Sequence, residues 1–129
     1  MAEGDIVFFN TYKKKVVDAD IDFLADTIKL ALYTGATPNI DTMEFISDMN
    51  GTEETGTGYT AGGETLGTKT TTVDTVNDQV DVDAADVTWT GLDVGTPSHA
   101  VLYKDTGTPT TSALICHVEI ATASNGGDY

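Results

Sequence analysis

Short runs of alternating apolar and polar residues, each ended by Gly, Pro or Thr, constrain the fold of this chain more than any other feature. The clearest run covers residues 113–121. Its alternation predicts a half-buried strand with Leu114, Cys116, Val118 and Ile120 facing inward, and with His117 and Glu119 facing outward. Residues 27–33 and 79–83 alternate in the same way, and residues 100–103 are apolar on both faces, as in a central strand. Residues 86–90 are expected to form a further short strand with Val87 and Trp89 on one side.

About five or six strands at this spacing, without alternating helices, indicate a mainly β fold, either an antiparallel β-sandwich or a jelly-roll-like domain. One or two short helices are expected near the N-terminus. One lies within residues 8–17, and a helical turn lies within residues 41–49, where Asp41 is placed to cap it. The length of 129 residues predicts a single β-rich domain over 1–129, with 1–17 as an N-terminal arm or short helix.

The charge of the chain argues against several classes of partner. It has no Arg, six Lys and 21 acidic residues, which gives a formal charge of −15. Nucleic-acid binding needs Lys and Arg to neutralise phosphates, and the same negative field opposes binding to anionic membranes, so neither partner is expected. A single cysteine, Cys116, has no partner for an internal disulfide, which indicates folding in a reducing cytoplasm.

The only basic cluster lies near the N-terminus. Phe8, Tyr12 and Val16 recur every four residues there, as on one face of a short amphipathic helix. A solvated polar face opposite that stripe is the simpler interpretation of the lysines. The alternative is an assembly contact for an acidic neighbour, including another copy of this chain, made by Phe8, Phe9, Tyr12, Lys13, Lys14 and Lys15. Deletion of residues 3–17 is then expected to weaken assembly while leaving the β domain folded.

The histidines and serines offer little basis for catalysis. Cys116 and His117 are neighbours on a predicted strand and point to opposite faces, so they are not expected to act as a pair. A Ser/His/Asp triad with Ser98, Ser112 or Ser124 lacks a Gly-x-Ser-x-Gly elbow. We therefore expect no catalytic residue.

Two further segments suggest ligand sites only weakly. The acidic residues between Asp74 and Asp86 offer the oxygen ligands that calcium prefers, but they lack the EF-hand order and suit the solvated face of a strand. The Gly-rich residues 56–63 lack the spacing of a phosphate loop and precede no helix. Neither a metal nor a cofactor is expected.

The order of several landmarks resembles a group of small virion proteins from tailed bacteriophages. The most recognisable are Gly58-Tyr59-Thr60-Ala61-Gly62-Gly63 and Asp86-Val87-Thr88-Trp89, and the resemblance extends from about Val7 to Tyr129. It implies a structural component of the virion, made in the cytoplasm of the bacterial host. The implied partners are the major capsid protein or other virion proteins, with the chain homo-oligomeric or present in many copies.

Two classes of function follow as hypotheses. The leading one is a non-enzymatic capsid decoration or cement protein, which would stabilise the shell by binding only the assembled state. A neck, connector or tail protein of the same particle is the alternative within that class. The second class is a carbohydrate- or ligand-binding β-sandwich module that stacks sugars on Trp89 or Tyr59, although the alternation of residues 86–90 places Trp89 in the core.

Overall fold

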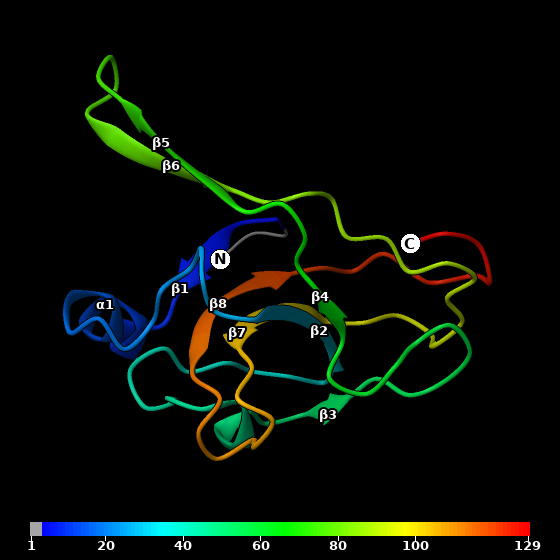
Figure 1. Cartoon of the computed structure of the whole chain (residues 1–129). Helices are drawn as coiled ribbons and strands as arrows, with labels where there is room; N and C mark the ends of the chain where they lie inside the picture. Colours follow the sequence, from blue (N-terminus) through cyan, green and yellow to red (C-terminus); the bar gives the residue numbers. More distant parts are fainter. Residues whose placement is uncertain (1–3) are drawn as a thin grey trace.

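The computed structural model describes residues 4–129 and contains one antiparallel sheet and a separate two-stranded hairpin. The sheet has the strand order β1-β8-β7-β2-β3, and β4 also pairs with β2 (Figure 1). Its strands are β1 (Ile6–Phe8), β2 (Ile28–Thr34), β3 (Thr52–Glu53), β4 (Glu64–Thr65), β7 (His99–Lys104) and β8 (Leu114–Glu119). The predicted mainly β, antiparallel class with a helix near the N-terminus is confirmed.

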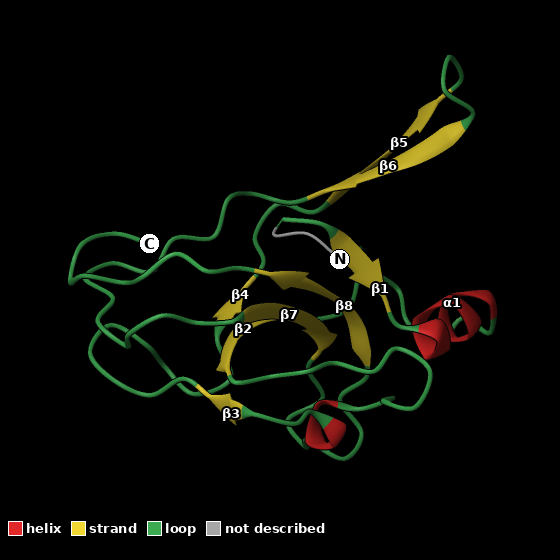
Figure 2. Ribbon diagram, turned by 180° about the vertical axis from the view of Figure 1, so that it is seen from behind, coloured by secondary structure: helices red, strands yellow, loops and turns green. Residues whose placement is uncertain are grey.

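The remaining elements lie around this sheet. The helix α1 (Asn10–Val17) follows β1 directly, and the single 3-10 turn η1 (Ile46–Asp48) lies within the helical segment predicted at 41–49. Asp48 fixes that turn by accepting hydrogen bonds from the backbone N–H groups of Glu44 and Phe45. The hairpin of β5 (Thr70–Asp74) and β6 (Gln79–Asp83) leaves the sheet and projects from the domain in both ribbon views (Figures 1 and 2).

Both faces of the sheet are covered, which makes the fold sandwich-like although loops supply much of the second layer. One face carries a cluster that includes Phe9, Ala31, Val101 and Leu114 and packs against Ile40, Ile46 and Met49 from the loop between β2 and β3. The opposite face carries two clusters. The first contains Ile21, Ile28, Ala113, Ile115 and Cys116, and the second contains Leu32, Trp89, Leu92 and Ala100.

The alternation predicts His117 on the solvent side of β8, and this prediction is wrong. Its side chain is only 1% exposed, and Cys116 on the opposite face is also buried. The ring lies 5.4 Å from the ring of Phe9 and 5.5 Å from that of His99, measured between centroids. Because both faces of β8 are covered, alternation along this strand separates two cores rather than a core from solvent.

The segment at residues 86–90 is not a strand, but the predicted burial of Trp89 is confirmed. Trp89 is 4% exposed, and its backbone exchanges two hydrogen bonds of 2.9 Å with Tyr129. Its indole packs beside the rings of Tyr59 and Tyr129, at centroid distances of 6.3 and 6.4 Å. An extended segment can thus place an aromatic side chain in the core while pairing with the end of the chain.

The N-terminal segment is part of the fold rather than a detachable arm. Within residues 4–17, β1 pairs with β8 at three positions, and Phe9 is fully buried in the core. The deletion considered from the sequence starts at residue 3, which lies outside the described residues. Its described part would remove Phe9 and leave the edge of β8 unpaired, so we now expect that deletion to unfold the domain.

The variant Trp89→Ala tests how much the aromatic cluster contributes to the stability of the domain. We expect the free energy of unfolding to fall by about 3–5 kcal/mol, as truncation of a buried large aromatic typically costs. Chemical denaturation followed by circular dichroism measures the change. The control Val76→Ala removes methyl groups from a side chain that is 88% exposed and should change stability by less than about 0.5 kcal/mol. Equal stability of Trp89→Ala and the control would contradict the core assignment.

The buried His99 and His117 should make the protein less stable as pH falls. Burial lowers the pKa of both rings, and the proximity of His99 lowers that of His117 further, whereas Glu119 acts to raise both. The unfolded chain therefore binds more protons below about pH 6.5, and protonation favours unfolding. We expect the free energy of unfolding to decrease from about pH 7 to pH 5.5, with a slope of up to about 1.4 kcal/mol per pH unit for each histidine.

Urea denaturation across that range measures the slope. The pKa values of Asp26, Asp48 and Asp105 are lowered, so these carboxylates titrate below this window. The double variant His99→Gln with His117→Gln should flatten the profile whatever its absolute stability. Burial raises the pKa of Glu54, which contributes the opposite slope, so the comparison with the double variant is decisive. Equal slopes for the wild type and the double variant would show that neither ring is kept neutral by the fold.

Candidate assembly surface

Every large apolar side chain that residues 4–129 leave exposed lies in one of two segments. The first surrounds α1 and β1, and we call it the α1–β1 surface: Ile6, Phe8, Val16, Val17 and Leu24. The second is the projecting hairpin: Val73, Val76, Val80 and Val82. Clustering of exposed apolar side chains, unlike their scattered occurrence, is typical of an interaction surface.

The hairpin has one apolar and one polar face, set by its register. Thr71 pairs with Val82 and Val73 with Val80, so these four side chains share one side of the ribbon, which we call the hairpin face. The alternate pairs place three aspartates on the other side, together with Thr70, Thr72 and Gln79: Asp74, Asp81 and Asp83. All residues of the two strands except Asp74 are exposed, so the core of the domain covers neither side.

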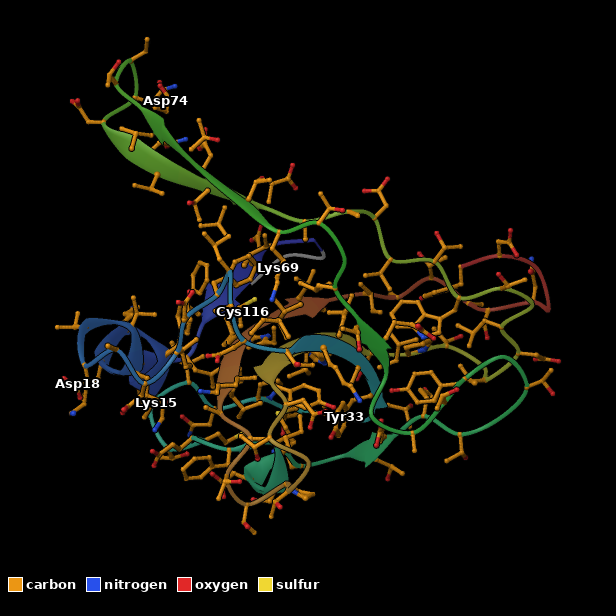
Figure 3. All side chains as sticks on the ribbon, in the orientation of Figure 1. Lys15, Asp18, Tyr33, Lys69, Asp74 and Cys116 are labelled. Atoms are coloured by element: carbon orange, nitrogen blue, oxygen red, sulfur yellow. The ribbon has the colours of Figure 1, made fainter. Side chains whose placement is uncertain are left out.

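Local hydrogen bonds hold the two ends of the hairpin. At the tip, Asp74 accepts hydrogen bonds from the N–H groups of Val76 and Asn77 at 2.9 and 3.1 Å, and from the Asn77 amide at 2.8 Å, which lowers its pKa. At the base, the Lys69 ammonium donates to the Asp26 carbonyl and lies over the ring of Phe23. Figure 3 shows Asp74 at the far end of the hairpin and Lys69 near the sheet, with most of β5 and β6 between them.

The α1–β1 surface is formed by a helix and an edge strand. No residue of α1 is buried, and Tyr12 stacks on Phe8 of β1 with ring centroids 5.5 Å apart. Beside them lies an apolar groove of about 260 Å³ between β1 and Phe23, with Leu102 and Cys116 in its lining and Val82 of the hairpin at one side. The base of the hairpin face is therefore continuous with this groove.

The structure separates the residues predicted as an assembly contact. Phe8, Lys13 and Lys14 are exposed, and Tyr12 and Lys15 are half-buried. Lys15 is used within the domain, where it forms an ion pair of 2.9 Å with Glu44 and lies over the Phe45 ring (Figure 3). Phe9 is fully buried, so its assignment to an assembly contact is wrong.

The hairpin is a part of the candidate surface that the sequence pattern did not predict. The alternation of residues 79–83 correctly predicted a strand, but such a pattern normally indicates one buried face. The available signal was the turn at residues 75–78, which separates the β-branched run 70–73 from the alternating run 79–83 and defines a hairpin. Nothing in that pattern indicates that the hairpin leaves the domain.

The serines considered as nucleophiles have structural roles. Each hydroxyl donates to a backbone carbonyl in its own surroundings: Ser98 to Tyr33, Ser112 to Thr108 and Ser124 to Gly95. Each also accepts a backbone N–H, from Ala36, Thr106 and Val94 respectively. These bonds fix loops against the sheet. Burial raises the pKa of the Cys116 thiol to about 12, which keeps it protonated and unreactive near neutral pH.

The Gly-rich segment at 56–63 is held by a carboxylate rather than open to an anion. Glu53 accepts hydrogen bonds from the Gly62 N–H at 2.5 Å and the Tyr59 hydroxyl at 2.8 Å. Gly63 has a φ of +81° and approaches β2 so closely that a Cβ would overlap the Leu30 carbonyl. The segment therefore acts as a close-packed turn whose charged partner repels phosphate.

A polar hollow of about 390 Å³ lies beside this turn, on the face of the sheet that carries Tyr33 and Tyr103. Its charged and hydroxyl groups bind one another: Lys29 pairs with Asp105 at 3.1 Å, and the Tyr103 hydroxyl donates to the Gly62 carbonyl at 2.6 Å. The sugar-stacking candidates do not line it. Trp89 is buried, and the Tyr59 hydroxyl is bound by Glu53 and the Leu32 N–H.

Within residues 4–129, no three His, Cys, Asp or Glu side chains lie close enough together to hold a metal ion. Over the same range, no helix has the length and hydropathy needed to span a bilayer. Comparison with protein-family models, curated proteins and solved structures finds no match to this chain.

Proposed function

We propose that this chain is a non-enzymatic structural protein of a tailed bacteriophage virion. The observation that carries the proposal is the projecting hairpin, whose apolar face its own domain leaves mostly exposed. A surface of this kind is useful to a protein that works by being covered in an assembly. The resemblance of residues 7–129 to small virion proteins suggests that this assembly is a bacteriophage virion.

The chemistry of the domain supports a structural rather than catalytic role. The candidate serines are engaged with backbone groups, the Cys116 thiol is buried, and both histidines lie in the core. The −15 charge supports contacts with other proteins in preference to nucleic acid or membrane. The partners we propose are the major capsid protein, other virion proteins and further copies of the chain.

Within the virion we propose a capsid decoration or cement protein, which stabilises the shell because it binds only the assembled state. A neck, connector or tail protein is the second candidate. It is favoured by one observation: the hairpin face and the α1–β1 surface are different surfaces of one chain, as a ring of identical subunits requires.

Quantitative mass spectrometry of purified particles tests this proposal. We expect the chain to be present at a fixed ratio to the major capsid protein. On the order of hundreds of copies would assign it to the shell, and about six or twelve would assign it to a ring at the neck or tail. Particles that lack the chain, while host lysate contains it, would contradict a virion role.

A further inference from the structure

We propose that the hairpin face of one copy docks on the α1–β1 surface of a neighbouring copy, so that identical chains join head to tail. This inference rests on the proposed structural function and names the partner that covers the exposed surfaces. The occupant is a second copy of the chain, and the contact is heterologous because the two surfaces differ.

The hairpin needs a partner on physical grounds. Val73, Val76 and Val80 are 71%, 88% and 60% exposed, so the domain leaves most of their apolar surface in water. An isolated two-stranded ribbon is marginally stable at best, and packing against another element is the usual remedy. Only the base of the hairpin approaches its own domain, where Val82 lines the apolar groove and Thr71 lines a shallow hollow beside Leu24.

The α1–β1 surface presents exposed apolar side chains against which the hairpin of another copy can pack. Val17 is 85% exposed and Ile6 is 61% exposed. Ile6 and Phe8 line the apolar groove, and Val16 and Leu24 line the shallow hollow that shares Phe23 with it. Within the described residues, β1 is an edge strand that pairs only with β8, so one side of its backbone is available for pairing. The surface thus presents apolar side chains and an open strand edge together.

Charge decides between this arrangement and a symmetric one. The hairpin carries Asp74, Asp78, Asp81 and Asp83 and no Lys between Lys69 and Lys104. These aspartates lie in the turn or on the side opposite the hairpin face, but two hairpins packed together would still bring eight carboxylates and no lysine into one small contact, which repels them. The helix α1 instead presents Lys13, whose ammonium contacts only the Asn10 side chain at 3.4 Å among the described residues. Lys14 is also exposed, but its ammonium is already paired with Asp18.

The same argument favours a second copy over a foreign partner. On a chain of charge −15, half of the six lysines lie in α1, and Lys13 has no acidic partner among the described residues, whereas the hairpin carries four aspartates and no lysine. In Figures 1 and 2 the hairpin projects on the same side of the molecule as α1, so neighbouring copies can reach both surfaces from that side. Repeated contacts of this kind close into a ring or continue as a filament.

Two variants remove one surface each. The hairpin variant is Val73→Asp with Val80→Asp, and its matched control is Thr70→Asp with Thr72→Asp, which adds the same charge to the opposite side of the ribbon. The surface variant is Val17→Glu with Leu24→Glu, and its control is Thr55→Glu with Thr110→Glu at exposed positions elsewhere. Far-ultraviolet circular dichroism and thermal melting verify that each protein is folded.

Sedimentation velocity over a range of concentrations then measures mass. We expect the wild type and both controls to associate, and each docking variant alone to remain monomeric. An equimolar mixture of the two docking variants should form a one-to-one complex and nothing larger, because each supplies the surface that the other lacks.

Three results would overturn the proposal. A monomeric wild type would exclude self-association, and a surface variant that still dimerises would indicate hairpin–hairpin contact. Controls that lose association as fully as the docking variants would indicate general charge repulsion. Particle composition separates this inference from the proposed function: a monomeric chain present in virions refutes only the docking, whereas head-to-tail assembly of a chain absent from virions refutes only the virion role.

Discussion

The pairing of β2 with β7 is the contact on which the rest of this structure depends. It joins six residue pairs, from Ile28 and Lys104 at one end to Tyr33 and His99 at the other. The other strands of the main sheet extend outward from it, with β8 and then β1 on the free side of β7, and with β3 and β4 on the free side of β2. Because clusters of buried side chains cover both faces, this pair is the centre of two cores.

Sequence patterns predicted the strands of that centre well and their surroundings less well. Alternation identified β2, β6 and β8, because a side-chain period of two is a local property of the chain, and an apolar run identified β7. It misplaced His117, because the covering of the second face comes from Phe9 and from loops far away in the sequence. Alternation correctly predicted that Trp89 is buried, but it wrongly predicted a strand at residues 86–90. The backbone of Trp89 pairs instead with Tyr129, which is 40 residues away in the sequence, so no local pattern indicates this pairing.

In the candidate surface, too, sequence patterns predict local features but not how the fold packs them. Of the residues predicted as an assembly contact, Phe8, Lys13 and Lys14 are exposed, but Phe9 turns inward where β1 ends and α1 begins. The hairpin has the alternation of a half-buried strand, yet its own domain approaches only Val82 at the base and leaves the other valines mostly exposed. A local pattern that the fold leaves unsatisfied is the expected mark of a functional surface.

Hydrogen exchange of the wild-type protein at low and at high concentration tests this account most directly, since it reports opening of the hairpin residue by residue. If a neighbouring copy covers the hairpin face, amides of β5, β6 and the α1–β1 surface should exchange more slowly in the concentrated sample, while those of β7 and β8 stay unchanged. Hairpin amides that exchange at the same fast rate in both samples would contradict the central claim.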